Sequence, residues 1–353
     1  MTRPAGDVCM ETKRQCANCG KEEGKEGAAL KKCARCQEEN AALYCSRACQ
    51  KEHWNRIHRE VCTKVFEVCE TEKGVGLRAG RQFSAGDVLF SEKPVLVHPR
   101  RVLITDVELE REIRSAEFDN LSVVLQRSVR ELFDKNAARA GTEKTLDGIW
   151  ETNAVALRET GDSGLFLKFS RLNHSCRPNV RHTWRNDKKK EFIIATRDIS
   201  PGDELLTCYI KEDDVFDITT ARQMVLRENF GFDCKCELCE RDGISAISEG
   251  NQRMREIGSL HRSIPMVAQS NPRRALQMVD TCLKLFRLQG LDMAFLEYML
   301  LNDGIQIAMI GLHDRQTAIQ YARRAVDAAK IAFGNDSPDV AKSSDIVRHL
   351  RQR

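Results

Sequence analysis

The sequence has no stretch of eighteen consecutive apolar residues, so we expect neither a membrane-spanning helix nor a membrane partner. Its first seven residues lack an apolar segment behind Arg3, so a secretory signal is not expected. A large excess of charge of one sign is also missing, because 56 basic and 52 acidic residues leave a net charge of +4. Such a small excess does not by itself predict nucleic-acid binding. We expect an intracellular protein, located in the nucleus, the cytoplasm or both.

What the sequence does contain is the composition of a globular chain with many thiols. Hydrophobic residues make up 41% and charged residues 31% of its 353 residues, a length that predicts two or three domains. Fifteen cysteines in a reducing compartment are not expected to form structural disulfides, which favours metal binding. Eight of them lie between Cys9 and Cys62, and after Cys69 none occurs until Cys176, which indicates a domain boundary.

The first cysteine cluster has the spacing of a double zinc site. Its eight candidate ligands form four close pairs: Cys16-x2-Cys19, Cys33-x2-Cys36, Cys45-x3-Cys49 and His58-x3-Cys62. Close pairs let two side chains reach one ion, and eight ligands suit two tetrahedral zinc ions. His53 competes with His58, but only His58 has the spacing to Cys62 that suits one helical turn.

The segment 16–62 resembles a MYND zinc finger, on the run Tyr44-Cys45-Ser46-Arg47-Ala48-Cys49-Gln50 followed by Trp54, His58 and Cys62. The resemblance implies interleaved binding, with Cys16, Cys19, Cys45 and Cys49 on one ion and Cys33, Cys36, His58 and Cys62 on the other. It also implies that the finger docks proline-containing peptides, although a purely structural module is an equal alternative. Residues 1–15 form an N-terminal tail.

Four further elements, in chain order, resemble a SET-domain lysine methyltransferase. They are Gly74-x-Gly76, Asn173-His174-Ser175-Cys176-x-Pro178-Asn179, Tyr209 after Glu204-Leu205, and the tail Cys234-x-Cys236-x2-Cys239. The tail has three ligands where a zinc site needs four, and by resemblance Cys176 supplies the fourth. This makes three zinc ions in total. Cys9, Cys69, Cys208 and Cys282 remain as ordinary thiols.

The same resemblance implies S-adenosyl-L-methionine as cofactor and assigns the site residues. Those implied to bind the cofactor are Lys73, Gly74, Gly76, Asn153, Asn173, His174 and Phe232. Tyr209 is implied as the catalytic tyrosine, and together with Phe230 it lines the channel for the substrate lysine. A satisfied core histidine is the alternative for His174, and a core position or turn capping is the alternative for Asn153. Phe230 stands where a tyrosine is common, so we hypothesise that di- or trimethylation is permitted.

The domain order departs from that of typical SET and MYND proteins, because the finger precedes the Gly74-x-Gly76 strand instead of interrupting the SET domain. We place the SET domain at 68–240, with a helical insertion at about 104–160 and a post-SET segment at 230–240. Apolar residues recur at helical spacing in the insertion: Phe118, Leu121, Val124, Leu125, Val129 and Leu132. Simple core packing is the favoured interpretation of that face.

Residues 241–353 are predicted to form amphipathic helices. Their apolar faces include Ala275, Leu276, Val279, Leu283 and Phe286, and then Ala318, Ile319, Ala322, Val326 and Ala329. The segment resembles the tetratricopeptide-like tail of SET and MYND proteins, acting either as a wall over the substrate cleft or as a stabilising element. The fold class is therefore α+β multidomain: a zinc-bound finger, a mostly-β SET domain and an all-α C-terminal region.

These features together predict a protein-lysine N-methyltransferase acting on histone or non-histone proteins, with a role in chromatin regulation in the histone case. The alternative is a catalytically weak or inactive adaptor that recruits protein partners, for instance in transcriptional regulation. Sequence-specific DNA binding is not expected, because no basic recognition helix is evident. The run Lys188-Lys189-Lys190 is interpreted as a solvated hairpin tip, and a monomer is assumed.

Overall fold

The computed structural model describes residues 14–24, 29–33, 42–58, 65–98, 107–157, 160–210, 216–240, 243–291 and 293–352. The chain divides into two compact units, Met1–Glu67 and Val68–Arg353. Within the described ranges, no helix combines the length and the apolar character needed to cross a membrane.

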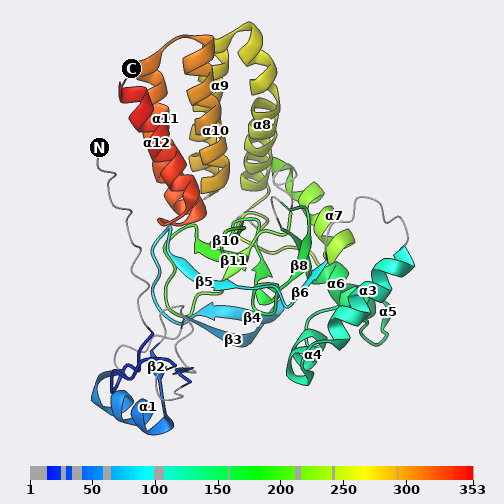
Figure 1. The fold of residues 1–353 in the computed structure, drawn as a ribbon. Coiled ribbons are helices and arrows are strands. Elements are labelled where there is room, and N and C mark those ends of the chain that lie inside the picture. The colour runs from blue at the N-terminus through cyan, green and yellow to red at the C-terminus, as the bar shows by residue number, and fades with distance from the viewer. Residues whose placement is uncertain are drawn as a thin grey trace, which may run out of the picture. The chain divides into compact units, whose positions relative to one another are not determined.

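The first unit is small and contains the cysteine pairs of the finger. Strand β1 (Lys31–Lys32) pairs antiparallel with β2 (Leu43–Tyr44), and helix α1 (Arg47–His53) continues into the π-helical turn η2 (Trp54–His58) (Figure 1). Ser46 caps α1 by accepting a hydrogen bond from the Cys49 N–H at 3.1 Å. The buried side chains of the described core are Cys16, Leu30, Cys33 and Tyr44. Because this core is so small, bound metal is expected to supply much of the unit's stability.

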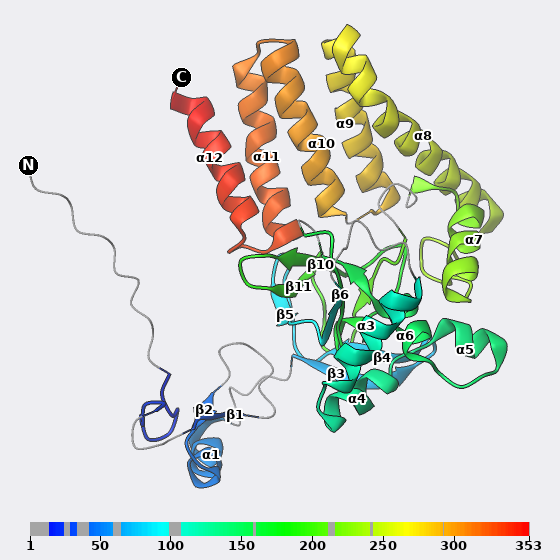
Figure 2. The ribbon, with the colours of Figure 1, turned by 45° about the vertical axis from the view of Figure 1, so that its right-hand side comes forward.

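Short strands in four sheets form the centre of the second unit (Figures 1 and 2). Strands β3 (Phe66–Thr71) and β4 (Gly74–Ala79) pair as a hairpin, and Gly74-x-Gly76 begins β4. The other sheets have the strand orders β10-β11-β5, β6-β8-β7 and β12-β9. Their bounds are β5 (Val88–Glu92), β6 (Leu96–His98), β7 (Val155–Ala156), β8 (Ser163–Leu165), β9 (Asn173–His174), β10 (Val180–Arg185), β11 (Lys190–Ala195) and β12 (Leu206–Thr207).

Strand β10 forms one edge of its three-stranded sheet and pairs antiparallel with β11. The two strands are joined by a short turn in which Lys188 and Lys189 are exposed. This confirms the prediction that the lysine run is a solvated hairpin tip. In the register of this pair, Trp184 lies opposite Glu191.

The insertion is helical, as predicted, but its apolar face is not continuous. Its helices are α3 (Val107–Asp119), α4 (Val123–Arg130), α5 (Lys135–Ala140) and α6 (Leu146–Asn153). Phe118, Val129 and Leu132 are buried, whereas Val124 and Leu125 are 74% and 37% exposed, so the prediction of one buried face is wrong in its middle. The reason is a break between α3 and α4, where Ser122 caps a new helix and resets the direction in which its side chains point.

The C-terminal region is an array of helices standing side by side on one side of the sheets (Figures 1 and 2). They are α8 (Gly243–Ser270), α9 (Pro272–Gln289), α10 (Ala294–Gln306), the π-helical turn η5 (Ile307–Gly311), α11 (Arg315–Phe333) and α12 (Pro338–Gln352). Helix α11 ends at Phe333, with Gly334 as its C-cap, and α12 begins at Pro338. Two arginines of β10 tie α11 to the sheet: Arg181 donates to the Ala332 carbonyl at 3.2 Å and Arg185 to the Phe333 carbonyl at 2.7 Å.

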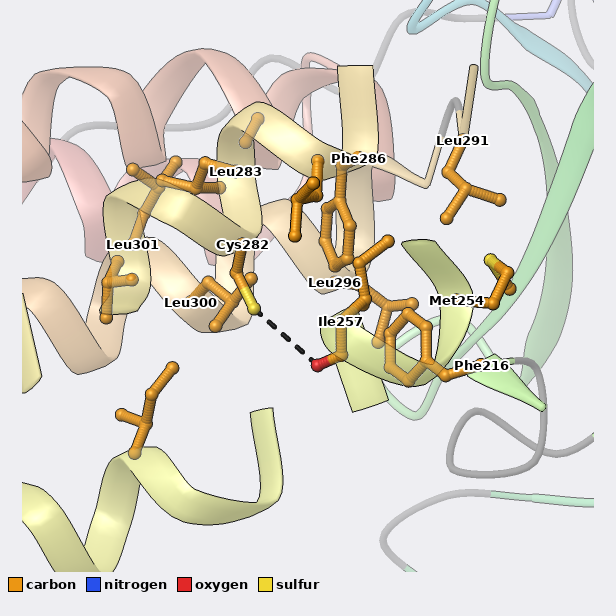
Figure 3. Packing of buried hydrophobic residues seen from close by; sticks show 14 of the residues in the cluster. Phe216, Met254, Ile257, Cys282, Leu283, Phe286, Leu291, Leu296, Leu300 and Leu301 are labelled. Atoms are coloured by element: carbon orange, nitrogen blue, oxygen red, sulfur yellow. Dashed lines mark hydrogen bonds between the residues drawn. The ribbon is translucent and has the colours of Figure 1, made fainter. Parts of the chain in front are cut away.

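The core of this region is apolar and includes one of the unassigned thiols (Figure 3). The predicted faces are confirmed, because Ala275, Val279, Leu283 and Phe286 are at most 3% exposed. Cys282 donates from its Sγ to the Ile257 carbonyl at 3.7 Å within this core. Burial raises the pKa of Cys282 to about 12. The same cause raises the pKa of Cys208 to about 12, so both thiols stay protonated near neutral pH, as expected of ordinary thiols.

Candidate functional site

Four cysteines of the finger converge on one point. The Sγ atoms of Cys16, Cys19, Cys45 and Cys49 all lie within 4.8 Å of one another. Cys45 and Cys49 flank the capped start of α1, which places both thiols on the same side of the first turn. Burial raises the pKa of the Cys16 thiol, but backbone hydrogen bonds from Cys19, Cys45 and Asn18 outweigh it and lower the pKa to about 6. A cluster of four thiols of this spacing fits a structural zinc ion.

The second set of finger ligands is only partly described. Cys36 and Cys62 lie outside the described residues, whereas Cys33 and His58 are both buried. Burial lowers the pKa of His58, and the neighbouring His53 lowers it further, so its ring is neutral and suited to bind a metal. The His53 Nδ1 instead lies 2.9 Å from the Tyr44 hydroxyl. The zinc ion predicted here stays a prediction.

The structure brings Cys176 together with the three cysteines of the tail. The four Sγ atoms of Cys176, Cys234, Cys236 and Cys239 lie within 4.8 Å of one another. Cys176 follows strand β9, while the others follow helix α7 (Thr219–Phe230), so the cluster joins two distant parts of the chain. Two such clusters of four cysteines are therefore evident within the described residues, both fitting zinc.

His174 links this cysteine cluster to Tyr209. Parallel pairing of β9 and β12 sets His174 opposite Thr207, two residues before Tyr209. The Tyr209 backbone N–H donates to His174 Nδ1 at 3.0 Å, and His174 Nε2 lies 3.3 Å from the Cys176 Sγ. Because Nδ1 accepts, Nε2 is the ring nitrogen left to donate to the Cys176 sulfur, which would be a thiolate once zinc is bound. With both ring nitrogens engaged, His174 has only backbone atoms to offer a cofactor.

Arg222 on α7 is a buried charged residue that was not predicted from the sequence. It is 1% exposed, and its Nη2 donates to Cys239 Sγ at 3.5 Å. Burial lowers the pKa of its guanidinium, but the charges of Cys176 and Cys239 raise it above its usual value. Four thiolates around one Zn²⁺ leave two negative charges, of which Arg222 neutralises one. One feature of the sequence could have indicated its burial: Arg222 lies four residues before the apolar Leu226, and both face the buried side of α7.

We expect Arg222→Met to weaken zinc binding at the tail cluster and to destabilise the second unit by about 3–5 kcal/mol, the usual cost of leaving one member of a buried charged set unpaired. Zinc release to a colorimetric chelator and thermal unfolding measure the two effects. Arg227→Met is the matched control, because Arg227 lies on the same helix but pairs at the surface with Asp233. Equal behaviour of the two variants would contradict this role.

The glycine hairpin, Asn173 and Glu204 form one polar cluster. Asn173 Nδ2 donates to Glu204 Oε1 at 2.9 Å, and Lys73 Nζ lies 3.0 Å from Glu204 Oε2. A Cβ on Gly76 would fall 2.7 Å from Asn173 Nδ2, so only glycine fits there, while Gly74 adopts a φ of +95° that favours glycine. Glu204 was not predicted as a site residue from the sequence, although it belongs to the same motif as Tyr209.

This cluster suits the methionine end of S-adenosyl-L-methionine, which carries one ammonium and one carboxylate. Glu204 offers an anion to the ammonium and Lys73 a cation to the carboxylate, and the hairpin glycines leave the backbone open to approach. The two side chains pair with each other in this structure, with Lys73 37% and Glu204 18% exposed. The residues present therefore fit the cofactor that the resemblance implies.

Tyr209 lies among the aromatic residues predicted for the channel and the cofactor pocket. Its ring centroid is 4.8 Å from that of Phe230, 5.3 Å from His174 and 6.4 Å from Phe232. Its hydroxyl donates to the Leu172 carbonyl at 2.6 Å. Burial raises the pKa of this hydroxyl, and the charge of Glu204 raises it further, so it remains protonated at neutral pH. Because the Tyr209 hydroxyl already donates its hydrogen to Leu172, its oxygen can act only as a hydrogen-bond acceptor toward a substrate.

The Asn153 side chain makes its hydrogen bonds within the insertion. Its Nδ2 donates to the carbonyls of Phe133 and Ile149, both at 2.7 Å, at the end of α6. This is the capping role weighed as its alternative, and the cofactor role implied by resemblance stays a prediction.

A cavity of about 470 Å³ lies beside Tyr209. Its walls come from β10, β11, the segment from Thr207 to Ile210 and the start of α10. The lining residues include Tyr209, His182, Trp184, Glu191 and Phe295. Because Tyr209 borders both the cavity and the polar cofactor cluster, the cavity is the candidate entry for a substrate side chain.

Comparison with known proteins matches the MYND finger model over residues 16–62 and the SET domain model over residues 74–210. The finger therefore precedes the SET domain, as the sequence predicts. The chain is 28% identical over 290 residues to the histone-lysine N-methyltransferase set5 of Schizosaccharomyces pombe, covering 82% of this chain and 85% of the relative.

The N-lysine methyltransferase SMYD2 of Homo sapiens is 26% identical over 230 residues, covering 61% of this chain and 48% of the relative, so the chain spans about half the length of that protein. The structure of Rubisco LSMT bound to AdoMet aligns over 86% of this chain and 91% of the other with 13% identity, but its TM-score of 0.30 is too low to support a conclusion. The chain therefore carries a MYND finger followed by a SET domain, and it is similar over most of its length to proteins named as lysine methyltransferases.

Proposed function

We propose that this protein is an S-adenosyl-L-methionine-dependent protein-lysine N-methyltransferase whose reacting centre surrounds Tyr209. The observation that carries the proposal is the fixed hydroxyl of this residue. It donates a hydrogen bond to the Leu172 carbonyl at 2.6 Å and lies among aromatic rings, next to a polar cluster that fits the cofactor. A catalytically inactive adaptor would not need this combination of a fixed hydroxyl, aromatic rings and a cofactor cluster.

When bound, S-adenosyl-L-methionine supplies the methyl group, whose bond to sulfur breaks as its bond to the lysine nitrogen forms. Phe230 and Phe232 exclude water, and desolvation lowers the pKa of the lysine so that its proton leaves to solvent. The Tyr209 oxygen accepts an N–H of the neutral amine and orients the nitrogen lone pair. Tyr209 is no base, because its raised pKa keeps it protonated.

The test is transfer of labelled methyl from S-adenosyl-L-methionine into core histones and into whole-lysate proteins, with labelled lysines located by mass spectrometry. The two relatives motivate both substrates, since one is named a histone-lysine and the other an N-lysine methyltransferase. Labelling of lysine that is lost in Tyr209→Phe supports the proposal. Cofactor binding without any labelled lysine favours the adaptor function.

We expect wild-type protein to add more than one methyl group per lysine and Phe230→Tyr to shift the product toward monomethyl-lysine. The added hydroxyl would lie beside Tyr209, 4.8 Å away between ring centroids, and would hydrogen-bond the amine so that a methylated nitrogen rotates less freely. Mass spectrometry at full conversion measures the product distribution. Only monomethyl-lysine from the wild type would contradict the expectation.

The finger supplies a second role in this proposal, docking protein partners through proline-containing segments while the chain stays monomeric. The match to the MYND finger model supports a role in protein interaction. Capture experiments with the full chain would identify the partner.

A further inference from the structure

The cavity beside Tyr209 contains a buried carboxylate that the proposed reaction does not use. Glu191 on β11 lines the cavity and is 1% exposed. Its Oε1 lies 2.9 Å from His182 Nδ1, while its buried Oε2 has no hydrogen-bond partner in the described part of the chain. Leaving a carboxyl oxygen unpaired in the interior is costly, so this arrangement requires an explanation.

A second unsatisfied group lies directly across the strand pair. Trp184 is opposite Glu191 in the β10–β11 register, is 8% exposed and also lines the cavity. Its indole N–H has no acceptor among the described residues. One wall of the cavity thus combines an indole ring, a free donor and a free anionic acceptor.

Arg181 lies on the same strand as Trp184, and its guanidinium contacts α10 and α11. Arg181 and Thr183 also line the cavity, but because side chains alternate along a strand they lie on the face of β10 opposite to that of His182 and Trp184. The Arg181 guanidinium lies 3.9 Å from the Phe295 ring centroid and donates to the Ala332 carbonyl at 3.2 Å. These contacts hold the guanidinium against α10 and α11, while Glu191 Oε1 pairs with His182 Nδ1 at 2.9 Å.

We propose that this cavity is a subsite for an arginine side chain that flanks the target lysine in the substrate protein, with Glu191 as its specificity-determining residue. The inference rests on the proposed function. A guanidinium presents planar N–H donors that suit the free Oε2 and a flat face that stacks on Trp184, which a lysine ammonium lacks. The Trp184 N–H is left to bond a backbone carbonyl of the same segment.

The test uses nine-residue peptides with a central lysine in an alanine–glycine background, in which each flanking position in turn carries arginine, lysine or citrulline. Citrulline has nearly the shape of arginine but no charge. At one position, arginine should raise kcat/KM at least tenfold over citrulline, mainly through KM. Glu191→Gln should abolish this preference while leaving the citrulline peptide unchanged, and Glu191→Asp should restore part of it.

Glu297→Gln is the matched control, because it removes one carboxylate from α10 outside the cavity lining and should keep the preference. Peptide binding is measured in parallel by fluorescence anisotropy with S-adenosylhomocysteine present, so the subsite is read without turnover. Arginine-selective binding without methylation would overturn the proposed function and keep the subsite. No arginine preference in the wild type, or an equal loss for all peptides in a folded Glu191→Gln protein, would overturn the subsite.

Discussion

Replacing Tyr209 by phenylalanine is expected to lower kcat by about 10²- to 10³-fold, the usual effect of removing one preorganised polar group from a transition state. The ring and its contacts with Phe230 remain, so the change removes only the acceptor that orients the amine. Cofactor affinity should change little, because the cofactor cluster is formed by Lys73, Asn173 and Glu204. Single-turnover methyl transfer and calorimetric binding of S-adenosylhomocysteine separate the two quantities.

Tyr321→Phe is the matched control, because the Tyr321 hydroxyl also donates from a buried ring, to Asp280 at 2.8 Å, but lies in the helical array. Both variants lose one hydrogen bond, worth about 1 kcal/mol of stability, and only Tyr209→Phe should lose activity. The raised pKa of Tyr209 adds a pH expectation: ionisation of this hydroxyl should not change the rate below about pH 10, its ordinary pKa. Full activity of Tyr209→Phe would show that the hydroxyl does not orient the amine.

Removing the zinc ion of the tail cluster should have the second large effect. We expect Cys239→Ser to bind one zinc ion fewer than the wild type and to lose about 10²-fold in activity, the order of loss caused by a displacement of about 1 Å at a reacting centre. The cluster joins Cys176, three residues after Asn173, to the tail that begins two residues after Phe232. Releasing this connection lets the aromatic wall and the His174 contact shift together.

Metal analysis, thermal unfolding and methyl transfer on the same preparations test this prediction. Cys282→Ala is the control, because Cys282 is equally buried but donates to the Ile257 carbonyl and belongs to neither evident cluster. It should lower stability while leaving the zinc content unchanged. A Cys239→Ser protein with full zinc content and full activity would contradict the coupling between cluster and site.

Much of the site was predictable because metal ligands and cofactor hairpins depend on local spacing. The pairs around Cys16 and Cys45, and the tail from Cys234, indicate their chemistry within a few residues of sequence. The helical faces of α9 and α11 were equally local, since one buried stripe follows from a period of 3.6 residues. The face of the insertion failed at Val124 because a capped break between two helices interrupts that period.

The residues that were missed share one property: each is a polar group defined by its neighbours in space. The role of Arg222 depends on thiolates that lie 12 or more residues away in the sequence. The role of Glu204 depends on its contacts with Lys73 and Asn173. Glu191 became noticeable only when the β10–β11 register and the first turn of α10 enclosed it in a cavity. No periodicity or spacing marks such positions in a single sequence.

The sequence by itself determined the ligand chemistry, the domain order and the helical character of the C-terminal region, because these follow from residue type and short spacing. The tertiary structure decided how these groups are placed and which of them stay protonated. Parallel pairing of β9 with β12 places His174 between Tyr209 and Cys176, and burial holds the Tyr209 hydroxyl protonated. The physical reason is that pKa values, charge pairing and cavity walls depend on desolvation and on groups distant along the chain, which only folding brings together.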